Sequence, residues 1–532
     1  MYRWNGWGDE DIEMPLPQEA ASMLENLAGS PAAPGPACPM ADIFSKIPQS
    51  RIRNPLSFFS TSAEDRLRHC HGQSFPDWVG FKYGSLERFP DAVALPETLE
   101  EVEEALQHAA RENVIVIPYG GGTSVVGHLS VPGADRPVLS LSLERLNRLL
   151  DLNSENRLAT FESGVRGPHL EAQLRSHGYT LGHYPQSFEQ SSLGGWVVTR
   201  SSGQQSLFYG RIEDLFAGGR LSTEKGELRF LPHPASAAGP DLRHIALGSE
   251  ARMGVLTEAR VRVREIPEAD EVYGVFFPSW ASAVDAVRTL ADAGLPLSMV
   301  RLSTPAETMT NLVLADHEKQ IRLLKHYLRL RGIYEDSFCM ALVGLIGSRS
   351  RARAGWRQAK SIIRSCKGVT VGKSMGNAWK KNRFLAPYLR NTLWDAGYAV
   401  DTLETAVNWD SVHSTMNAVE GAIQEGLAEK DEKVHVFSHL SHVYPTGSSI
   451  YTTYVFCLAE TAEENLSRWQ KLKSAASRAI VESGGTISHQ HGVGEDHREY
   501  LAAEKGKLGV DLLNHIWSFA DPGQRMNPGK LS

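Results

Sequence analysis

The sequence lacks the features that would mark a membrane, secreted or nucleic-acid-binding protein. None of its 532 residues falls in a run of about 18 consecutive apolar residues, so we expect no transmembrane helix. The formal net charge of −7 argues against a nucleic-acid partner, which requires a basic surface. The N-terminus, MYRWNGWGDEDIEM, has no basic segment followed by an apolar one, so no secretory signal is expected. The final GKLS is not the Ser-Lys-Leu peroxisomal address.

Cysteine is also scarce, and its spacing is uninformative. There are five: Cys38, Cys70, Cys339, Cys366 and Cys457. Because none of them forms a paired metal-binding spacing, we predict reduced thiols in a cytoplasmic protein and no metal site. The hydrophobic content of 42% and the charged content of 22% are ordinary for a globular protein. A chain of this length is too long for one compact core, so two or three domains are expected.

Regular patterning becomes clear from residue 88. The apolar run at 91–96 ends in proline, as a short strand would. Thr98 and Glu101 form a capping box, and the helix that follows has one apolar face. Residues 114–118, VIVIP, are a second buried strand. A β-α-β unit this short favours a parallel pair with a right-handed crossover.

A glycine run, PYGGGTSVVG (118–127), stands at the carboxyl end of that second strand. Its spacing matches neither the Rossmann nor the Walker fingerprint. Glycines without Cβ atoms can turn several N–H groups toward one point, and such a nest binds anions, with Thr123 and Ser124 as hydroxyl donors. The alternative is a tight turn without a ligand.

The remaining patterns divide the chain into four predicted segments. Residues 1–87 are a helical or irregular segment with a Pro/Ala/Gly-rich loop at 28–40. A nucleotide-binding domain covers 88–267, with further strands at 136–142, 157–164 and 259–266 and a helix at 169–178. A cap or substrate domain covers 268–480, with helices near 280–294, 304–331 and 414–429 and strands near 272–277 and 449–457. A helix at 462–485 leads into a C-terminal segment, 481–532, that returns to the nucleotide-binding domain.

Three loops rich in small residues carry a family resemblance. They are PYGGGTS, then PQSFEQSSLGGWVVTRSSG (185–203), then GSEARMGVLTEA (248–259). In this order they resemble the FAD domain of the vanillyl-alcohol-oxidase flavoprotein superfamily. The resemblance implies an α+β fold: a two-subdomain FAD-binding domain and a cap domain built on a sheet covered by helices. It also implies FAD as the cofactor.

The same resemblance assigns residues to the flavin. From the first loop these are Pro118, Tyr119, Gly120, Gly121, Gly122, Thr123, Ser124 and Val125; from the second, Pro185, Ser187, Ser191, Ser192, Gly194, Gly195, Thr199, Arg200, Ser201 and Ser202; from the third, Glu250, Met253, Gly254 and Val255. Many relatives tether the flavin to a histidine beside the glycine run. Here no His or Cys occurs among residues 119–124, and His128 lies beyond the loop, so we predict non-covalent FAD.

Further motifs resemble the alkylglycerone-phosphate synthase (alkyldihydroxyacetonephosphate synthase) family from residue 3 to the end. They are RWNGWG (3–8), RHCHG (68–72), PYGGGTS, GGWVVTRSSG, RIEDL (211–215) and SHQHGVG (488–494). This resemblance implies exchange of the acyl group of acyl-dihydroxyacetone phosphate for a fatty alcohol through a flavin N5 adduct, as in ether lipid synthesis. A homodimer is also implied. Such chemistry needs a proton shuttle, a cationic clamp for the phosphate and an apolar tunnel for the chain.

The family's catalytic residues transfer to six positions. These are Tyr451, His489, Gln490, His491, Arg301 and Arg390. The resemblance makes Tyr451 the catalytic tyrosine, residues 489–491 a triple-histidine motif facing flavin and substrate, and the arginines neighbours of the phosphate and reacting carbon. From pattern alone, Tyr451 would be a strand tyrosine, the histidines a turn pair, and the arginines solvated surface residues.

Three departures separate the chain from the family pattern. Gln490 replaces the middle histidine and cannot carry a proton at neutral pH. His439 stands where the synthases carry an arginine, and the usual Glu-Gly-Thr turn is Glu250-Ala251-Arg252. A related FAD-linked oxidoreductase acting on a 2-hydroxy acid or similar alcohol therefore remains the alternative function. Its common metal signature, H-x-G-D-G-N-x-H, is absent from SHVYPTGSSIY (441–451).

Two basic stretches bear on membrane contact. EKQIRLLKHYLRLRG (318–332) has apolar residues along one face and basic residues nearby, and RSRARAGWRQAK (349–360) is also basic. In an acidic protein these stretches could dock on anionic lipid at the inner face of a membrane. A solvated helix face is the alternative.

Overall fold

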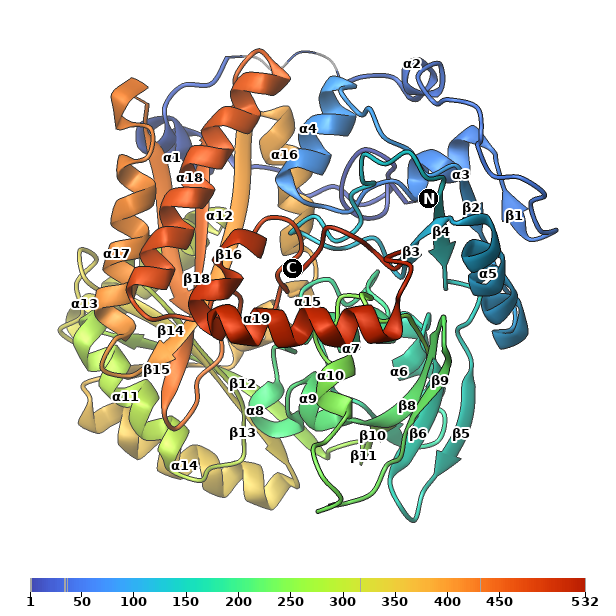
Figure 1. The fold of residues 1–532 in the computed structure, drawn as a ribbon. Helices are drawn as coiled ribbons and strands as arrows, with labels where there is room; N and C mark the ends of the chain where they lie inside the picture. The colour runs from blue at the N-terminus through green and yellow to red at the C-terminus, as the bar shows by residue number, and fades with distance from the viewer. Residues whose placement is uncertain (1, 33–34, 36, 316, 431, 532) are drawn as a thin grey trace.

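The structure is a computed structural model, and it describes residues 2–32, 35, 37–315, 317–430 and 432–531. The N-terminal segment runs along the top of the molecule in Figure 1. Its elements are α1 (Gln18–Ala28), α2 (Met40–Phe44), β1 (Phe59–Ser60), α3 (Ala63–Arg68) and α4 (Phe75–Tyr83). Positions 33, 34 and 36 of the predicted 28–40 loop lie outside the described residues.

The first sheet has the strand order β1–β2–β4–β3, with β2 (Ala92–Ala94), β3 (Ile115–Tyr119) and β4 (Val138–Ser142). The predicted β-α-β unit is present, since α5 (Leu99–Glu112) joins β2 to β3. Both strands are parallel to β4, which lies between them, so the two predicted strands are not neighbours. The Thr98 side chain accepts from the Glu101 N–H as predicted, but the Glu101 carboxylate accepts from the N–H of Glu97 instead of Thr98.

The second sheet is antiparallel, with the order β5–β6–β10–β8–β9. Its strands are β5 (Leu149–Asn153), β6 (Leu158–Glu162), β8 (Phe216–Thr223), β9 (Gly226–Phe230) and β10 (Val255–Arg262). Short helices connect them: α6 (Gly167–Arg175), α7 (Leu193–Thr199), α8 (Ser206–Tyr209), α9 (Ile212–Leu215) and α10 (Arg243–Ala246). β7 (Tyr179–Thr180) pairs separately with β11 (Arg264–Glu265). The four-stranded and five-stranded sheets form the two subdomains of the FAD-binding fold class that the sequence predicts.

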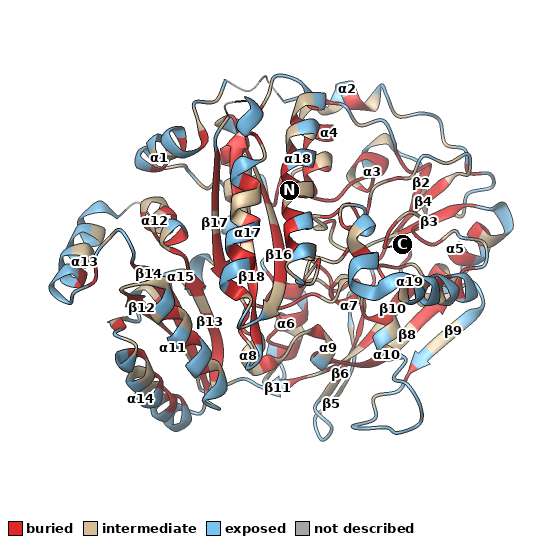
Figure 2. Ribbon diagram, turned by 60° about the vertical axis from the view of Figure 1, so that its left-hand side comes forward, coloured by how far each residue is buried: buried red, intermediate tan, exposed pale blue. Residues whose placement is uncertain are grey.

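The third sheet has seven strands in the order β15–β12–β14–β13–β17–β18–β16, and every pairing in it is antiparallel among the described residues. The strands are β12 (Ala269–Phe277), β13 (Leu297–Ser303), β14 (Cys339–Gly347), β15 (Val369–Gly372), β16 (Tyr398–Asn408), β17 (Val434–Leu440) and β18 (Gly447–Cys457). Figure 2 shows these strands buried between helices whose outward sides are exposed.

Alternating side chains of β12 bind different helices to the two faces of this sheet. Val275 and Phe277 pack against α11 (Trp280–Asp292) and α14 (Arg349–Ser365), whereas Phe276 packs against α12 (Pro305–Leu314) and α13 (Glu318–Leu330). The remaining helices are α15 (Ser374–Asn382), α16 (Leu389–Asp395), α17 (Val412–Glu425), α18 (Ala462–Glu482) and the short turns η1 (Ala386–Tyr388), η2 (Ala428–Lys430) and η3 (Arg498–Tyr500). The predicted single helix at 304–331 is two helices, α12 and α13.

The C-terminal segment returns to the first sheet. Helix α19 (Leu501–Ala520) crosses the front of the molecule in Figure 1 and is interrupted at Gly506, whose φ is 67°. Beyond it, Met526 forms a parallel bridge with Val116 of β3. Among the described residues no helix is both long and apolar enough to cross a membrane.

Candidate functional site

One large cavity of about 1480 Å³ is shared by the glycine loops and the inner face of the seven-stranded sheet. This exceeds the roughly 300–1,000 Å³ that is typical of a pocket for one small molecule. At one end the walls are the 118–125 and 185–204 loops, and at the other they are α1, α12, α13 and strands β14, β16, β17 and β18. The cavity therefore has room for a cofactor beside a second molecule.

The glycine loop presents bare backbone to this cavity. Hydrogen bonding within the described part of the chain leaves the backbone N–H groups of residues 120–125 without a partner. Gly121 lies directly against the second loop, since a Cβ there would stand 1.9 Å from the Gln190 carbonyl oxygen. Gly122 has a φ of 68°, which favours glycine. These free N–H groups fit an anion such as a dinucleotide's pyrophosphate. A side chain at Gly121 would prevent the first and second loops from lying this close together.

Most residues assigned to the flavin by resemblance line the cavity. These are Pro118, Gly120, Gly121, Gly122, Thr123, Ser124, Val125, Pro185, Ser187, Ser191, Ser192, Gly195, Thr199, Ser201 and Glu250. The cavity lining does not include Tyr119, Gly194, Arg200, Ser202, Met253, Gly254 or Val255.

Five of the seven residues away from the cavity make contacts that hold the loops or the core next to them. The Tyr119 hydroxyl donates to the carbonyl of Arg68, and the Gly194 N–H donates to Ser163 O at 2.7 Å. Arg200 pairs with Glu213 at 3.6 Å. Met253 and Val255 are buried in two hydrophobic clusters, and their expected contact with the flavin stays a prediction.

Glu250 ties the third loop to the histidine motif. Its carboxylate accepts from the N–H of Val493 at 2.5 Å and of Gly494 at 2.9 Å. The next residue, Ala251, has a φ of 61° in the left-handed region, where the family pattern has glycine. The turn keeps its shape despite the substitution, at a cost of roughly 1–2 kcal/mol.

His128 is the histidine nearest the glycine run on the cavity wall, with the Ser124 hydroxyl beside one ring nitrogen and the Glu250 carboxylate beside the other. Nδ1 lies 2.8 Å from the Ser124 hydroxyl, and Nε2 lies 3.1 Å from the Glu250 carboxylate. Because a carboxylate only accepts, Nε2 carries the proton and Nδ1 accepts from Ser124. The imidazole is thus held as part of the wall.

The opposite end of the cavity is lined by a row of rings from three separate elements. The Tyr451 ring stacks on His439 with centroids 4.9 Å apart and meets His491 edge-on at 5.8 Å. Gln490 lines the cavity beside them. Burial raises the pKa of the Tyr451 phenol well above its usual value and lowers the pKa of His491. At neutral pH the phenol is therefore a proton donor.

Arg390 is a buried cation without a carboxylate partner at hydrogen-bond distance. Its Nη1 donates to the carbonyl of Gln73 at 2.6 Å, while Nε and Nη2 are buried without partners among the described residues. The guanidinium lies over the Trp78 ring at 4.4 Å. Burial lowers the pKa of Arg390 to about 10, so it remains charged at neutral pH. Two unmet donors on a cavity-lining cation fit an anionic ligand.

Arg301 differs, because a neighbouring carboxylate already neutralises it. Its Nη2 donates to Glu307 Oε1 at 2.8 Å, and His439 Nδ1 lies 2.8 Å from the same oxygen. Sequence reasoning missed Glu307, which stands three residues after the N-cap Thr304 of α12 and resembles an ordinary helix-capping residue. Burial opposes its ionisation, but His439 and Arg301 outweigh this and lower the pKa of Glu307 to about 2.

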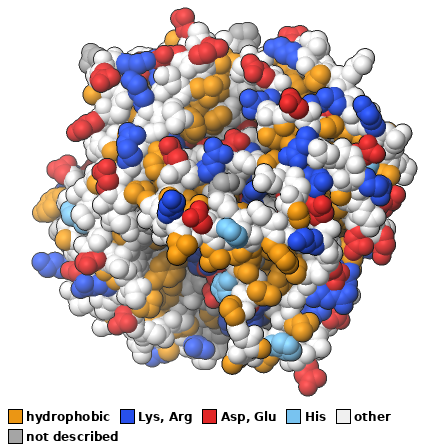
Figure 3. Space-filling view, viewed as in Figure 1, with side chains coloured by type: hydrophobic (Ala, Val, Ile, Leu, Met, Phe, Trp, Pro, Cys, Tyr) orange, Lys and Arg blue, Asp and Glu red, His pale blue; other side chains and the backbone are white. Residues whose placement is uncertain are grey.

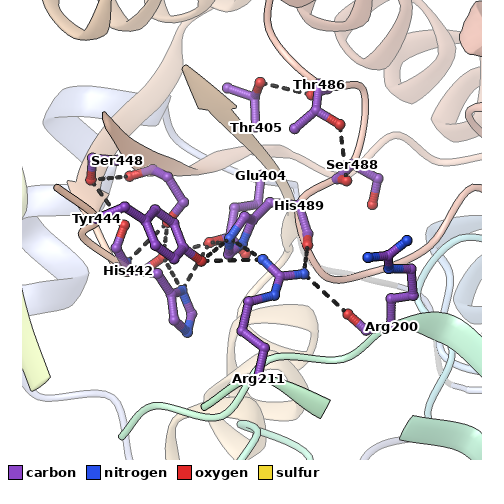
Figure 4. A network of polar contacts seen from close by, with 12 residues as sticks. Arg200, Arg211, Glu404, Thr405, His442, Tyr444, Ser448, Thr486, Ser488 and His489 are labelled. Atoms are coloured by element: carbon purple, nitrogen blue, oxygen red, sulfur yellow. Dashed lines mark hydrogen bonds and ion pairs between the residues drawn. The ribbon is translucent and has the colours of Figure 1, made fainter. Parts of the chain in front are cut away.

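His489 is not among the residues that line the cavity, whereas Gln490 and His491 are, and a role for His489 beside the flavin stays a prediction. Figure 4 shows it inside a network behind the wall, clamped by Arg211. Arg211 Nη1 lies 2.6 Å from His489 Nε2, and Arg211 Nη2 donates to the His489 carbonyl at 2.8 Å. A guanidinium only donates, so His489 Nε2 accepts and the ring proton resides on Nδ1, 3.2 Å from Glu404.

The same network contains the one group of potential metal ligands found among the described residues: Glu404, His442 and His489. Their ligand atoms lie within 4.8 Å of one another. In the structure these side chains are linked by ion pairs and hydrogen bonds that connect the 489–491 turn to β16 and to Arg211. Sequence reasoning did not single out Arg211, Glu404 or Tyr444, which come from separate elements.

The cavity joins an anion-binding group of backbone N–H donors to a row of titratable side chains on the seven-stranded sheet. This combination is typical of a cofactor-dependent enzyme. Residues 266–531, half of the chain, match the family described as FAD linked oxidases, C-terminal domain, and residues 90–231 match the family described as FAD binding domain. The chain belongs to the FAD-linked oxidase family, and FAD is its cofactor, as predicted.

Individual relatives are more specific. The chain is 29% identical to the alkyldihydroxyacetonephosphate synthase of Dictyostelium discoideum, with 99% of this chain and 93% of that protein covered. A solved structure of an alkyldihydroxyacetonephosphate synthase superposes with a TM-score of 0.86 at 26% identity over 99% of this chain and 98% of that one. p-Cresol methylhydroxylase shares the fold, with a TM-score of 0.67 at 13% identity over 98% of both chains. The resemblance to the synthase family is thereby confirmed.

Proposed function

We propose that the protein exchanges the acyl group of an acyl-dihydroxyacetone phosphate for a fatty alcohol, forming an ether lipid precursor. The observation that carries this proposal is the unpaired guanidinium of Arg390 in a cavity far larger than a small 2-hydroxy acid needs. Arg390 is the phosphate ligand, because its Nε and Nη2 donors are unmet. Arg301 is compensated by Glu307 and orients the neighbouring residues instead.

FAD is held non-covalently, with its pyrophosphate on the N–H groups of residues 120–125. When bound, it supplies a ring that can exchange electrons with the carbon that loses the acyl group. Support for non-covalent binding comes from His128, whose ring nitrogens are both committed to Ser124 and Glu250.

The cavity has a polar part and an apolar part, which suit different parts of the substrates. Arg390, Tyr451 and His491 line the polar end, which suits the dihydroxyacetone phosphate unit. The apolar end is lined by side chains that suit acyl and alkyl chains: Leu16, Met23, Leu24, Leu312, Ile321, Leu324, Met340, Phe437 and Val455. The raised pKa of Tyr451 keeps the phenol protonated, so it can donate a hydrogen bond to oxygen at the reacting end.

The central test is anaerobic. We expect palmitoyl-dihydroxyacetone phosphate to bleach the flavin absorbance of the purified protein and hexadecanol to yield the alkyl product. Tyr451→Phe should retain flavin and lose about 10²–10⁴-fold in turnover. If D-2-hydroxy acids bleach the flavin and the lipid does not, the oxidoreductase alternative replaces this proposal. Acid precipitation should release the flavin; flavin remaining on the chain would contradict non-covalent binding.

We also propose a cytoplasmic location with peripheral contact to the inner face of the membrane. Helix α13 supports this, since Leu323 and Leu330 are 70% and 72% exposed, basic side chains flank them, and Ile321 of the same helix lines the cavity. Anionic vesicles should sediment the protein, and Leu323→Glu with Leu330→Glu should abolish this binding. Equal binding to neutral vesicles would contradict the charge argument.

A homodimer is the proposed assembly. Figure 3 shows apolar side chains gathered across the middle of one face, over α19, where Leu508, Leu512 and Phe519 are exposed. We propose that a second copy covers this face. Light scattering should give twice the 58.6 kDa chain mass, and Leu512→Glu should shift it to the monomer.

A further inference from the structure

His439 and Glu307 form a buried acid–imidazole pair on the cavity wall beside Tyr451. His439 comes from β17 and Glu307 from the first turn of α12, and both line the cavity. Glu307 Oε1 lies 2.8 Å from His439 Nδ1, and each side chain is less than a tenth exposed. The pair is thus held in place from two elements.

The proton positions in this pair follow from its neighbours. Glu307 is ionised, because Arg301 and His439 lower its pKa to about 2 despite burial. Two groups approach Nδ1 of His439: the Glu307 carboxylate at 2.8 Å and Nη2 of Arg301 at 3.3 Å. The carboxylate is the nearer of the two and only accepts, so we assign the ring proton to Nδ1. No hydrogen bond within the described chain involves Nε2, which leaves this nitrogen as an acceptor for a cavity ligand. Burial and Arg301 lower the pKa of His439, so the ring is neutral at pH 7.

His439 stands where the polar and apolar parts of the cavity meet. In the sheet register it is opposite Tyr451, while Phe437, two residues earlier on β17, is opposite Thr453 and faces the apolar end. Helix α1, whose Leu24 lines the apolar end, packs on β17 and β18. An alcohol whose chain lies along these apolar walls would bring its hydroxyl to the His439–Tyr451 row.

We propose that His439, oriented by Glu307, is the base that accepts the hydroxyl proton of the incoming fatty alcohol; this rests on the proposed function. The alcohol O–H bond breaks and its proton moves to Nε2. The oxygen uses that electron pair to form the new C–O bond. The fatty acid leaves as carboxylate with the electrons of its C–O bond, and His439 then returns the proton to solvent. Glu307 is a positioning residue that stabilises the transient imidazolium.

The experiment uses two nucleophiles that differ only in needing a base. An alcohol must lose a proton, whereas a fatty carboxylate need not. In the holoenzyme, His439→Gln should retain flavin absorbance and exchange of labelled palmitate into palmitoyl-dihydroxyacetone phosphate. Its alkyl product formation from hexadecanol should fall about 10²–10⁴-fold. His413→Gln, on the exposed side of α17, is the matched control.

Each outcome bears on a different claim. A wild-type enzyme that performs neither exchange nor alkylation refutes the proposed function. If the wild type performs both reactions and His439→Gln loses alkylation and palmitate exchange by the same factor, or loses neither, the base assignment alone is refuted. Glu307→Gln, which leaves the imidazole in place, should share the selective loss of alkylation, and wild-type selectivity in this variant also overturns the assignment.

The pH profile gives a second readout. Arg301, Glu307, Glu404 and Tyr451 are the charged and titratable groups around His439. Burial and Arg301 lower the pKa of His439, and their effect outweighs that of Glu307 and Glu404, which raise it. Wild-type alkylation should therefore fall as pH drops through the His439 pKa, while palmitate exchange should not show this step. A shared acid limb for both reactions would overturn the inference.

Discussion

The two ends of the cavity are built from different materials. The cofactor end is mainly backbone: residues 120–125 offer free N–H groups, and Gly121 allows two loops to touch. The substrate end is made of buried ionisable side chains, including Arg390, Glu307 and Tyr451, from separate elements. A backbone site tolerates almost no added atom, whereas a side-chain site depends on charge balance. Substitutions at the two ends should therefore fail in different ways.

Adding one methyl group at the cofactor end should have the largest effect. In Gly121→Ala the new Cβ would lie 1.9 Å from the Gln190 carbonyl, which is backbone and cannot move away, so we expect loss of FAD. Gly120→Ala is the matched control, because its Cβ meets only the Ser192 hydroxyl, which can rotate. Flavin absorbance of the purified proteins measures both. Equal flavin content in Gly121→Ala and Gly120→Ala would contradict the expected difference between the two positions.

Acid should destabilise the fold through buried histidines, two of which lie on the substrate side. Burial lowers the pKa of His183 to about 3 and of His435 and His489 to about 4, below 6.5 in the unfolded chain. At these three groups the unfolded state binds more protons, so their contribution to stability falls as pH drops below about 6.5, by about 4 kcal/mol per pH unit near pH 5. Buried Asp496, whose pKa is raised to about 7, offsets about 1 kcal/mol per pH unit of this fall.

Thermal unfolding between pH 7 and 4.5 checks this, and a flat Tm would refute it. His435→Gln keeps a partner for Thr310 and should reduce the slope by about 1 kcal/mol per pH unit.

Removing charge at the substrate end should weaken binding without harming the fold. Arg390→Leu should raise the KM for the phosphorylated substrate on the order of 10²–10³-fold, equivalent to about 3–4 kcal/mol. Because the guanidinium has no carboxylate partner, the substrate-free variant should unfold at the same or a higher temperature and keep its flavin. A lower Tm with unchanged KM would make Arg390 structural.

The smallest expected effect is a change in stability at Ala251, in the turn that connects to the 489–494 segment. Ala251→Gly relieves a left-handed residue but adds freedom to the unfolded chain, so the gain should be below about 1 kcal/mol. Chemical denaturation measures this difference. A destabilised variant would show that the Ala251 methyl group contributes more by packing than its backbone conformation costs.

The same contrast explains what could be predicted from the sequence. The cofactor end uses local motifs, so β3, α5, β4 and the glycine loop could be predicted from the residue pattern, and FAD was implied by the family resemblance of the three loops. At the substrate end, charged side chains interrupt the apolar patterns from which strands and helices are predicted. Strand β16 carries Asp401 and Glu404 on an otherwise apolar run, and it was not predicted. Glu307 resembled a helix cap, and the clamp of Arg211 on His489 joins residues far apart in sequence.

The bridge between Met526 and Val116 has a consequence for how the protein is made. Strand β3 and its glycine loop leave the ribosome early, but the segment that borders β3 emerges among the final residues. The nucleotide cradle therefore reaches its finished form only after translation is nearly complete. Flavin loading is accordingly a late step in biogenesis, and nascent chains should be colourless.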